Sequence, residues 1–328
     1  MTWGTACGVI SALAYTGANI LLKLLSQEGV DPVWVSCVKA APTAALAWWM
    51  IARRARRGLP ALPPARLLPG LLAAGLFMQL GGNVSFQWAL GEIGLAVCIP
   101  LVFGTLIIGG ALLGRIWLGE SISHRSALAM LLLVAAVTVL SFGTQDARDA
   151  VSPSADNSGL TTVVLATAAA CLAGLAYAVC NTVIRRVATG AVSLSATLMV
   201  LSTSGVVSLG VLALARIGPG GCLQTTAAQW GVMLAAGLFN AAAFFSLGLA
   251  LQTVTIVRAN TINASQVAMC AVAGLILFGE PATASLGIGI ALTMAGLLIV
   301  TRARKTPSTD RQETREPKTP LSVMPDET

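Results

Sequence analysis

The sequence LAYTGAN at residues 13–19 returns as LAYAVCN at residues 175–181, an offset of 162. Three further matches follow in the same order along the chain: Lys23 with Arg185, Gly75–Phe77 with Gly237–Phe239, and Leu118–Glu120 with Phe278–Glu280. One such match arises easily by chance, whereas four in order indicate an internal repeat, which is common in membrane transporters. The sequence therefore predicts two related halves.

The composition places this repeat in a membrane. Of the 328 residues, 56% are hydrophobic and 10% are charged, and the mean hydropathy is +0.82. A soluble domain is about 25% charged. Because most of a soluble protein's surface faces water, so few charges exclude an ordinary soluble enzyme. The apolar runs are continuous and do not alternate with period two, so we expect helices and not a β-barrel.

Ten apolar runs come close to the roughly 20 residues that a helix needs to cross the hydrocarbon core. We expect spans at Thr2–Leu24, Pro32–Ala52, Leu67–Leu90, Gly94–Leu118, His124–Gly143, Leu160–Arg185, Ser193–Arg216, Ala227–Gln252, Thr255–Phe278 and Thr283–Val300. The predicted fold class is therefore an all-α polytopic membrane protein with ten transmembrane helices.

Five spans in each half make the second half enter the membrane in the opposite sense. The two halves then form an inverted-topology repeat, the construction that many secondary transporters use for alternating access. We expect the first five-helix repeat at residues 2–143, an outer, periplasmic linker at 144–159, the second repeat at 160–301, and a disordered cytoplasmic tail at 302–328.

The charges predict the orientation. The net charge of +7 comes from basic residues grouped between the second and third spans and after the last span, which is typical of the positive-inside rule and not of nucleic-acid binding. With the N-terminus inside, the inner segments hold 16 of the 20 Lys and Arg residues. We therefore expect both termini in the cytoplasm and a multi-pass protein of a bacterial inner membrane.

The ends of the two halves carry a family resemblance. They read Leu118-Gly119-Glu120 and Phe278-Gly279-Glu280, and Pro100 lies in the fourth span. In these features the chain resembles the drug/metabolite transporter superfamily, in its ten-helix EamA-type branch. The resemblance implies a secondary carrier or exporter of small metabolites, amino acids or drugs, and it does not name the substrate. The chain has Lys39 where that family often has arginine, and Asn260 at the repeat position of Pro100.

Polar side chains within the spans are the candidate site, because burying them in lipid is costly unless they face a cavity or a partner. Tyr15 and Asn19 are four residues apart and share one helix face, as do Tyr177 and Asn181 in the other half. Two interpretations remain open. Both pairs line a central path for substrate, or each asparagine binds a neighbouring helix and holds the bundle together.

Lys39 is the one ion that we expect deep within a span, seven residues into the second helix. Its side chain extends outward to the interface, or pairs with Glu28, Asp31 or Glu92 as a structural lock, or meets a carboxylate of the substrate. The sequence favours the structural or gating roles over the substrate.

Neutral amides supply the remaining candidates. Gln79, Asn83 and Gln87 are spaced by four and predict a polar stripe along the third span. Of this stripe, Gln79 and Asn83 are substrate-binding candidates, as are Asn240 in the eighth span, Asn263 and Gln266 in the ninth, and Trp88. We expect Trp88 either in the interfacial belt of tryptophans or stacked on an aromatic substrate. Amides both donate and accept hydrogen bonds, which suits a polar or zwitterionic solute.

Several functions find no support in the sequence. No acidic residue lies near the middle of a span, no Walker A motif is present, and no Cys/His cluster forms a metal site. We therefore expect no cofactor, no metal and no enzymatic activity. The expected partners are a small-molecule substrate and the lipid bilayer, without nucleic acid, and a homodimer is left open.

The predicted function is a secondary transporter that moves a small metabolite across the inner membrane by alternating access, with export favoured by the resemblance alone. The metabolite is amino-acid-like, another polar compound or a drug. The alternatives are an importer or exchanger of the same fold, or a polytopic membrane enzyme or lipid flippase. Glu120 and Glu280 are interpreted as structural turn residues.

Overall fold

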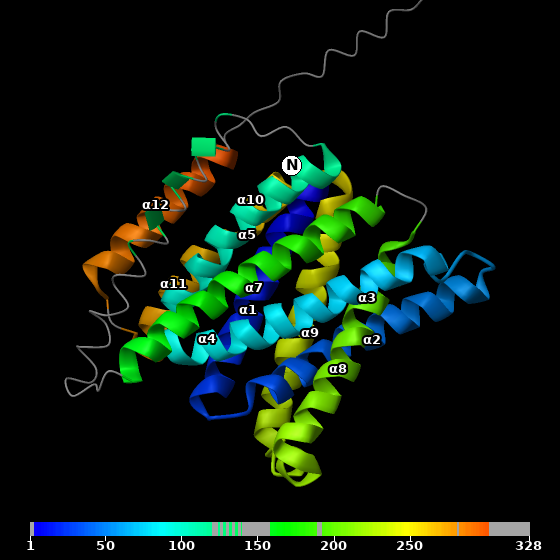
Figure 1. Cartoon of the computed structure of the whole chain (residues 1–328), viewed down its shortest axis with the longest axis horizontal. Helices are drawn as coiled ribbons and strands as arrows, with labels where there is room; N and C mark the ends of the chain where they lie inside the picture. Colours follow the sequence, from blue (N-terminus) through cyan, green and yellow to red (C-terminus); the bar gives the residue numbers. More distant parts are fainter. Residues whose placement is uncertain are drawn as a thin grey trace, which may run out of the picture.

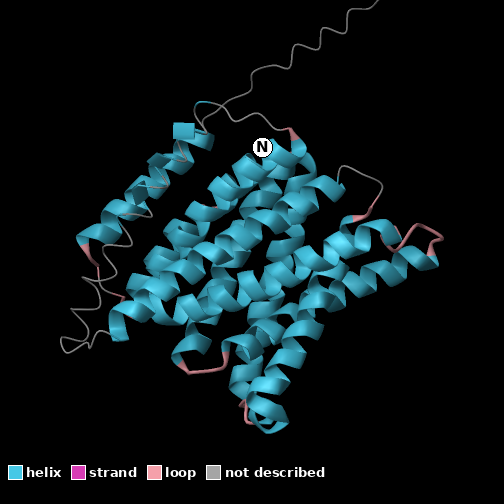
Figure 2. Ribbon diagram, in the orientation of Figure 1, coloured by secondary structure: helices cyan, strands magenta, loops and turns pink. Residues whose placement is uncertain are grey.

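The computed structural model describes residues 3–119, 158–188, 192–280 and 282–301, together with scattered positions between 124 and 139. The described residues form helices joined by short loops, and they contain no strand (Figure 2). The all-helical class predicted from the sequence is therefore confirmed for this part of the chain.

The helices follow one another in the order of the predicted spans (Figure 1). They are α1 (Trp3–Gln27), α2 (Pro32–Arg56), η1 (Ala65–Leu67), α3 (Leu68–Phe77), η2 (Met78–Val84), α4 (Ser85–Ile93), α5 (Leu95–Leu118), α7 (Ser158–Ala188), α8 (Leu194–Leu223), α9 (Ala227–Thr253), α10 (Ile256–Asn263), α11 (Gln266–Phe278) and α12 (Ala284–Thr301).

Eight helical stretches of the described residues are long and apolar enough to cross a membrane, and they coincide with eight of the ten predicted spans. The chain is therefore a multi-pass membrane protein. The predicted span His124–Gly143 lies largely outside the described residues. The tenth predicted span corresponds to α12, whose apolar part Ala284–Gly296 is shorter.

Local sequence signals explain where the helices begin and end. Asp31 caps α2 by accepting hydrogen bonds from the backbone N–H groups of Val33 and Trp34 at 2.9 and 3.0 Å. Gly119 and Gly279 end α5 and α11 in the left-handed conformation, with φ of 67° and 62°. Glycine adopts this conformation without a steric cost, which explains the Gly-Glu ends of both halves.

Two spans are not the continuous α-helices that the sequence predicted. The third span changes from α3 into the π-helical segment η2 and then into α4. The ninth span is broken at Ala264 and Ser265 into α10 and α11. Interruptions of this kind concentrate at functional sites, and in membranes they are tolerated where the backbone is buried or lines a cavity.

The two halves of the sequence are interleaved in space. Helix α1 packs against α9, α5 against α7, and α2 against α8, so each pair joins one helix from each half (Figure 1). The largest buried cluster joins residues of both halves, among them Leu22, Ile99, Ala173 and Val267. The contacts between the two halves therefore form the centre of the bundle.

The outer surface of the bundle is apolar. Ile116, Val211 and Ile276 are exposed by 71%, 65% and 75%, as expected for side chains that face lipid. Four tryptophans near the ends of the predicted spans, namely Trp3, Trp48, Trp49 and Trp117, are exposed by 69%, 49%, 54% and 43%. This exposure fits interfacial tryptophans better than substrate stacking.

Candidate functional site

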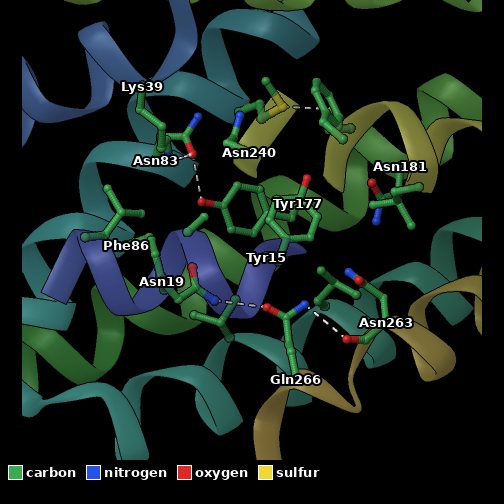
Figure 3. A pocket seen from close by; sticks show the side chains of 18 of the residues that line it. Tyr15, Asn19, Lys39, Asn83, Phe86, Tyr177, Asn181, Asn240, Asn263 and Gln266 are labelled. Carbon is green, nitrogen blue, oxygen red and sulfur yellow. Dashed lines mark hydrogen bonds between the residues drawn. The ribbon is translucent and has the colours of Figure 1, made fainter. Parts of the chain in front are cut away.

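A cavity lies at the centre of the bundle, between the two halves (Figure 3). The cavity has a volume of about 90 Å³, which is several times the space that one water molecule needs, so it has room for a small solute. Its polar lining residues are Tyr15, Asn19, Lys39, Thr43, Gln79, Asn83, Tyr177, Asn181, Ser202, Asn240, Asn263 and Gln266.

Ten of the eleven side chains predicted from the sequence as substrate-binding lie on this cavity. They come from α1, α2, η2, α7, α9, α10 and α11, which are far apart in the sequence. The eleventh residue, Trp88, is half-buried in α4 and is not among the lining residues. The structure therefore does not place Trp88 with the other candidates.

The two asparagines of the repeat are both buried and both bind the ninth span. The amide of Asn19 donates to Oε1 of Gln266 at 3.0 Å, and the amide of Asn181 donates to Oδ1 of Asn260 at 2.8 Å. Gln266 in turn donates to the backbone oxygen of Asn263 at 3.0 Å and so fastens the break between α10 and α11. Each asparagine thus lines the cavity and also ties helices together, so the two interpretations are compatible.

Lys39 is 3% exposed and points to a neutral partner. Its Nζ donates to Oδ1 of Asn83 at 2.8 Å (Figure 3). The acidic partners considered for a lock are elsewhere, since Glu28 and Glu92 are exposed and Asp31 pairs with Arg216 at 3.5 Å. A lock between Lys39 and these three residues is therefore not present in this structure.

Asn83 is the centre of a hydrogen-bond chain. Its Oδ1 also accepts from the hydroxyl of Tyr177 at 3.0 Å, and its amide donates to Oε1 of Gln79 at 2.6 Å. Gln79 then donates to the backbone oxygen of Leu201 at 3.2 Å. The chain joins α2, η2, α7 and α8, so it connects both halves of the protein through one amide.

The polar stripe predicted for the third span ends before Gln87. This side chain is buried and donates to the backbone oxygen of Leu22 at 3.0 Å, so it binds α4 to α1 and is not among the cavity residues. Gln79 and Asn83 both lie in the π-helical segment η2, whereas Gln87 lies in the α-helix α4 that follows it. The neighbouring Gly81-Gly82 pair is the sequence signal for this irregularity.

Two polar lining residues were not singled out from the sequence. Thr43 accepts from the amide of Asn240 at 3.2 Å, and its position one turn after Lys39 was a usable signal. Ser202 lies on the cavity from α8, and no feature of the sequence marks it. Three phenylalanines, Phe86, Phe103 and Phe244, add an aromatic lining that the sequence analysis also missed.

Glu280 and Lys23 form an ionic cluster away from the cavity. The carboxylate of Glu280 accepts from the backbone N–H groups of Leu95 and Ala96 at 2.6 and 2.7 Å, and lies 3.9 Å from Nζ of Lys23. Lys23 also donates to the backbone oxygen of Leu90 at 3.2 Å. Glu280 is thus a structural residue, as expected. Lys23 lies within α1 and is buried. The expectation that Lys39 is the one ion deep within a span is therefore wrong. Glu120 lies outside the described residues.

The described residues contain no group of three His, Cys, Asp or Glu side chains that could hold a metal ion. The seven cysteines are free thiols, and six of them are buried. Cys222 lies in the last part of α8 and is buried. These cysteines pack as small apolar side chains.

The comparisons with known proteins agree with the resemblance. Residues 164–302, from α7 to the end of α12, match the EamA-like transporter family. A solved structure titled "Crystal structure of protein" is similar with a TM-score of 0.63, over 91% of this chain and 96% of that chain, at 17% sequence identity, which shows a shared fold. No curated protein matches the sequence.

Proposed function

We propose that this chain, which carries an EamA-like transporter domain at residues 164–302, is a secondary transporter that moves a small polar metabolite through its central cavity by alternating access. The metabolite is amino-acid-like or of similar size and polarity. The protein spans a bacterial inner membrane, and its termini lie in the cytoplasm.

The observation that carries the proposal is the position of the polar groups. In an apolar bundle, twelve polar side chains from both halves gather on one cavity. Polar groups at membrane depth are costly and tend to mark substrate pathways. The breaks in the third and ninth spans occur at the same cavity, at Gln79, Asn83, Asn263 and Gln266. This combination is typical of a transporter binding site.

Matched contacts in the two halves support an inverted repeat. Lys23 donates to the backbone oxygen of Leu90, and Arg185, its partner in the repeat, donates to that of Leu251 at 2.7 Å. The two acceptors are 161 residues apart, close to the offset of 162 between the two basic residues. Two halves with equivalent contacts can exchange conformations, so that a site between them opens to either side in turn.

Contacts between helix ends support the proposed grouping of the span ends on two sides. The pairs Lys23–Glu280 and Asp31–Arg216 join residues that the charge pattern places outside. On the inner side, Arg258 donates to the hydroxyl of Thr5 at 3.3 Å. No contact among these three crosses from one predicted side to the other. The outward direction of transport rests on the family resemblance alone.

A polytopic membrane enzyme is the weaker candidate. Catalysis by general acids and bases needs titratable groups within reach of each other and of substrate. Among the described residues that line the cavity, the titratable side chains are Lys39, Tyr15, Tyr177 and Cys180, without a carboxylate or a histidine. Among the described residues, no hydrogen bond joins two of these four side chains, because Lys39 and Tyr177 both bind Asn83 and Cys180 contacts Met78.

Counterflow in proteoliposomes tests the proposed function. Vesicles that contain the purified protein are loaded with an unlabelled amino acid, nucleobase or short organic acid, and uptake of the same labelled solute is followed. We expect at least one solute to show saturable uptake that increases when it is present on the far side. A flux that does not saturate and ignores solute on the far side would indicate a channel instead.

The paired asparagines give a second expected result. We expect Asn19→Ala and Asn181→Ala each to reduce counterflow at least tenfold, because each change removes a cavity amide and frees its partner on the ninth span. Ser85→Ala, whose hydroxyl is outside the cavity lining, is the control and should leave transport unchanged. Wild-type transport in both asparagine variants at normal expression would show that these residues do not line the path.

A further inference from the structure

We propose that Lys39, together with the hydroxyl of Tyr177, forms an anion subsite that binds a carboxylate of the transported solute. This proposal rests on the proposed function and deepens it. It states that the solute has a negative charge and presents it to the end of the cavity at Lys39. The two donors now meet at Oδ1 of Asn83, and we place the substrate oxygen next to this atom, within reach of both (Figure 3).

The ammonium group of Lys39 has no charged partner among the described residues. Lys39 is 3% exposed and lines the cavity, and its hydrogen-bond partner among the described residues is one neutral amide oxygen. An ammonium has three donors. Burying a charged group is strongly unfavourable unless an opposite charge and hydrogen bonds compensate it. In its protonated form, Lys39 therefore has two donors and its charge available for an anionic ligand.

The partly buried carboxylates of the part of the chain that the structure describes have partners outside the cavity. Asp31 caps α2 and pairs with Arg216, and Glu280 binds Lys23 and the start of α5. The described residues that line the cavity include no acidic side chain. The field in the cavity is therefore positive around Lys39, and a solute carboxylate is the group that this field attracts.

Two hydrogen-bond donors, one from each half of the chain, converge on one oxygen atom in the cavity. Nζ of Lys39, from the first half, and the hydroxyl of Tyr177, from the second, both donate to Oδ1 of Asn83, at 2.8 and 3.0 Å. Donors that already meet at one oxygen can bind a carboxylate oxygen in the same geometry, with charge-assisted hydrogen bonds that are stronger than the present ones. Asn83 stays in place when it is displaced as the acceptor, because Gln79 accepts its amide at 2.6 Å.

The opposite end of the cavity has the complementary character. Oδ1 of Asn263 is buried and has no hydrogen-bond partner among the described residues. Asn263 and Gln266 lie across the cavity from Lys39 and Asn83 (Figure 3). A buried acceptor without a partner favours a ligand that donates a hydrogen bond there. The solute therefore carries a carboxylate at one end and a donor group at the other.

The experiment compares carboxylates with their carboxamides. Thermal unfolding of the purified protein in detergent is measured with alanine, leucine and phenylalanine, with the three matching amino acid amides, and with sodium chloride and sodium phosphate. The pairs have nearly the same shape, so a difference reports the carboxylate. We expect at least one amino acid to bind at least tenfold more tightly than its amide, and inorganic anions to have no such effect.

Two substitutions locate the effect. Lys39→Met should abolish the preference for the carboxylate, and Lys39→Arg should retain part of it because the charge remains. Asn83→Asp gives Lys39 a fixed carboxylate at the same position, so we expect this variant to unfold at a higher temperature than the wild type and to lose carboxylate binding. Asn83→Asp keeps Lys39 in place, so this variant tests the subsite even if Lys39→Met fails to fold.

The outcomes separate the two proposals. If the protein shows counterflow but binds amino acids and their amides equally, the anion subsite is overturned and the proposed transport function stands. The same conclusion follows if Asn83→Asp retains the preference for the carboxylate. Stabilisation by chloride or phosphate equal to that by an amino acid also overturns it, because the site then binds small inorganic anions. Absence of saturable flux for every solute overturns the proposed function, and the anion subsite with it.

Discussion

Replacing Glu280 by alanine is expected to lower the stability of the protein by about 3 kcal/mol or more, since breaking a buried ion pair typically costs about 3–5 kcal/mol. The side chains of Lys23 and Glu280 are 9% and 14% exposed, so the lysine left behind would be a nearly buried and unpaired charge. The backbone N–H groups of Leu95 and Ala96 would also lose a charged acceptor. One carboxylate thus connects α11, the start of α5 and the end of α1.

Thermal unfolding in detergent measures this effect. The control is Glu92→Ala, which removes an exposed carboxylate near the same end of the bundle and should leave the melting temperature nearly unchanged. A double variant, Lys23→Met with Glu280→Ala, should regain part of the loss because no unpaired charge remains. If Glu280→Ala melts at the same temperature as Glu92→Ala, the ionic cluster does not stabilise the fold.

The sequence predicted the spans well because the membrane imposes one simple requirement. A segment that crosses lipid must satisfy its backbone within a helix and present apolar side chains, and both features are local. The observed α2, α5 and α9 accordingly begin within one residue of the expected starts. The polar candidates were found for the same reason, since a polar side chain in an apolar run is conspicuous. Ten of them meet at one cavity.

The sequence did not predict the breaks in the third and ninth spans, which decide the details of the site. Counting by four along an ideal helix placed Gln87 with Gln79 and Asn83, whereas the helix changes from η2 to α4 between them and Gln87 binds α1. A single extra residue rotates a helix by about 100°, so the error in the face is large although the sequence shift is small. The break after Asn263 depends in part on the contact between Gln266 and Asn19, which are 247 residues apart.

Long-range partners are also beyond a local analysis. Glu280 had no basic residue near it in the sequence, and its partners Lys23 and Leu95 come from distant helices. The position of a carboxylate at the end of a helix did indicate a specific partner, because the helix dipole disfavours a negative charge there. The helix dipole predicts that Glu280 has a partner, and the tertiary structure identifies Lys23 and the start of α5 as that partner.

Gly174→Ala is expected to reduce transport at least tenfold and to destabilise the fold, because α7 crosses α5 at this glycine without room for a methyl group. A Cβ atom at residue 174 would overlap the backbone oxygen of Val102 and the hydroxyl of Thr105, and would lie 3.0 Å from the backbone nitrogen of Leu106. The backbone cannot move aside alone, and Thr105 is held by hydrogen bonds to Leu101 and Val102 at 3.0 and 3.1 Å. The two helices must therefore separate, and such overpacking typically costs about 1–3 kcal/mol.

The separation acts on the site because the crossing lies next to it. Tyr177 follows Gly174 by one turn of α7 and lines the cavity, as do Val102 and Leu106 on α5. The control is Gly210→Ala in α8, where the new Cβ would meet Sγ of Cys37 at an ordinary distance of 3.6 Å. Because alanine favours helix by about 1 kcal/mol over glycine, this control should be neutral or slightly stabilising. Counterflow and melting temperatures of the two variants give the comparison, and equal behaviour would show that the close approach of α5 and α7 is not required for the site.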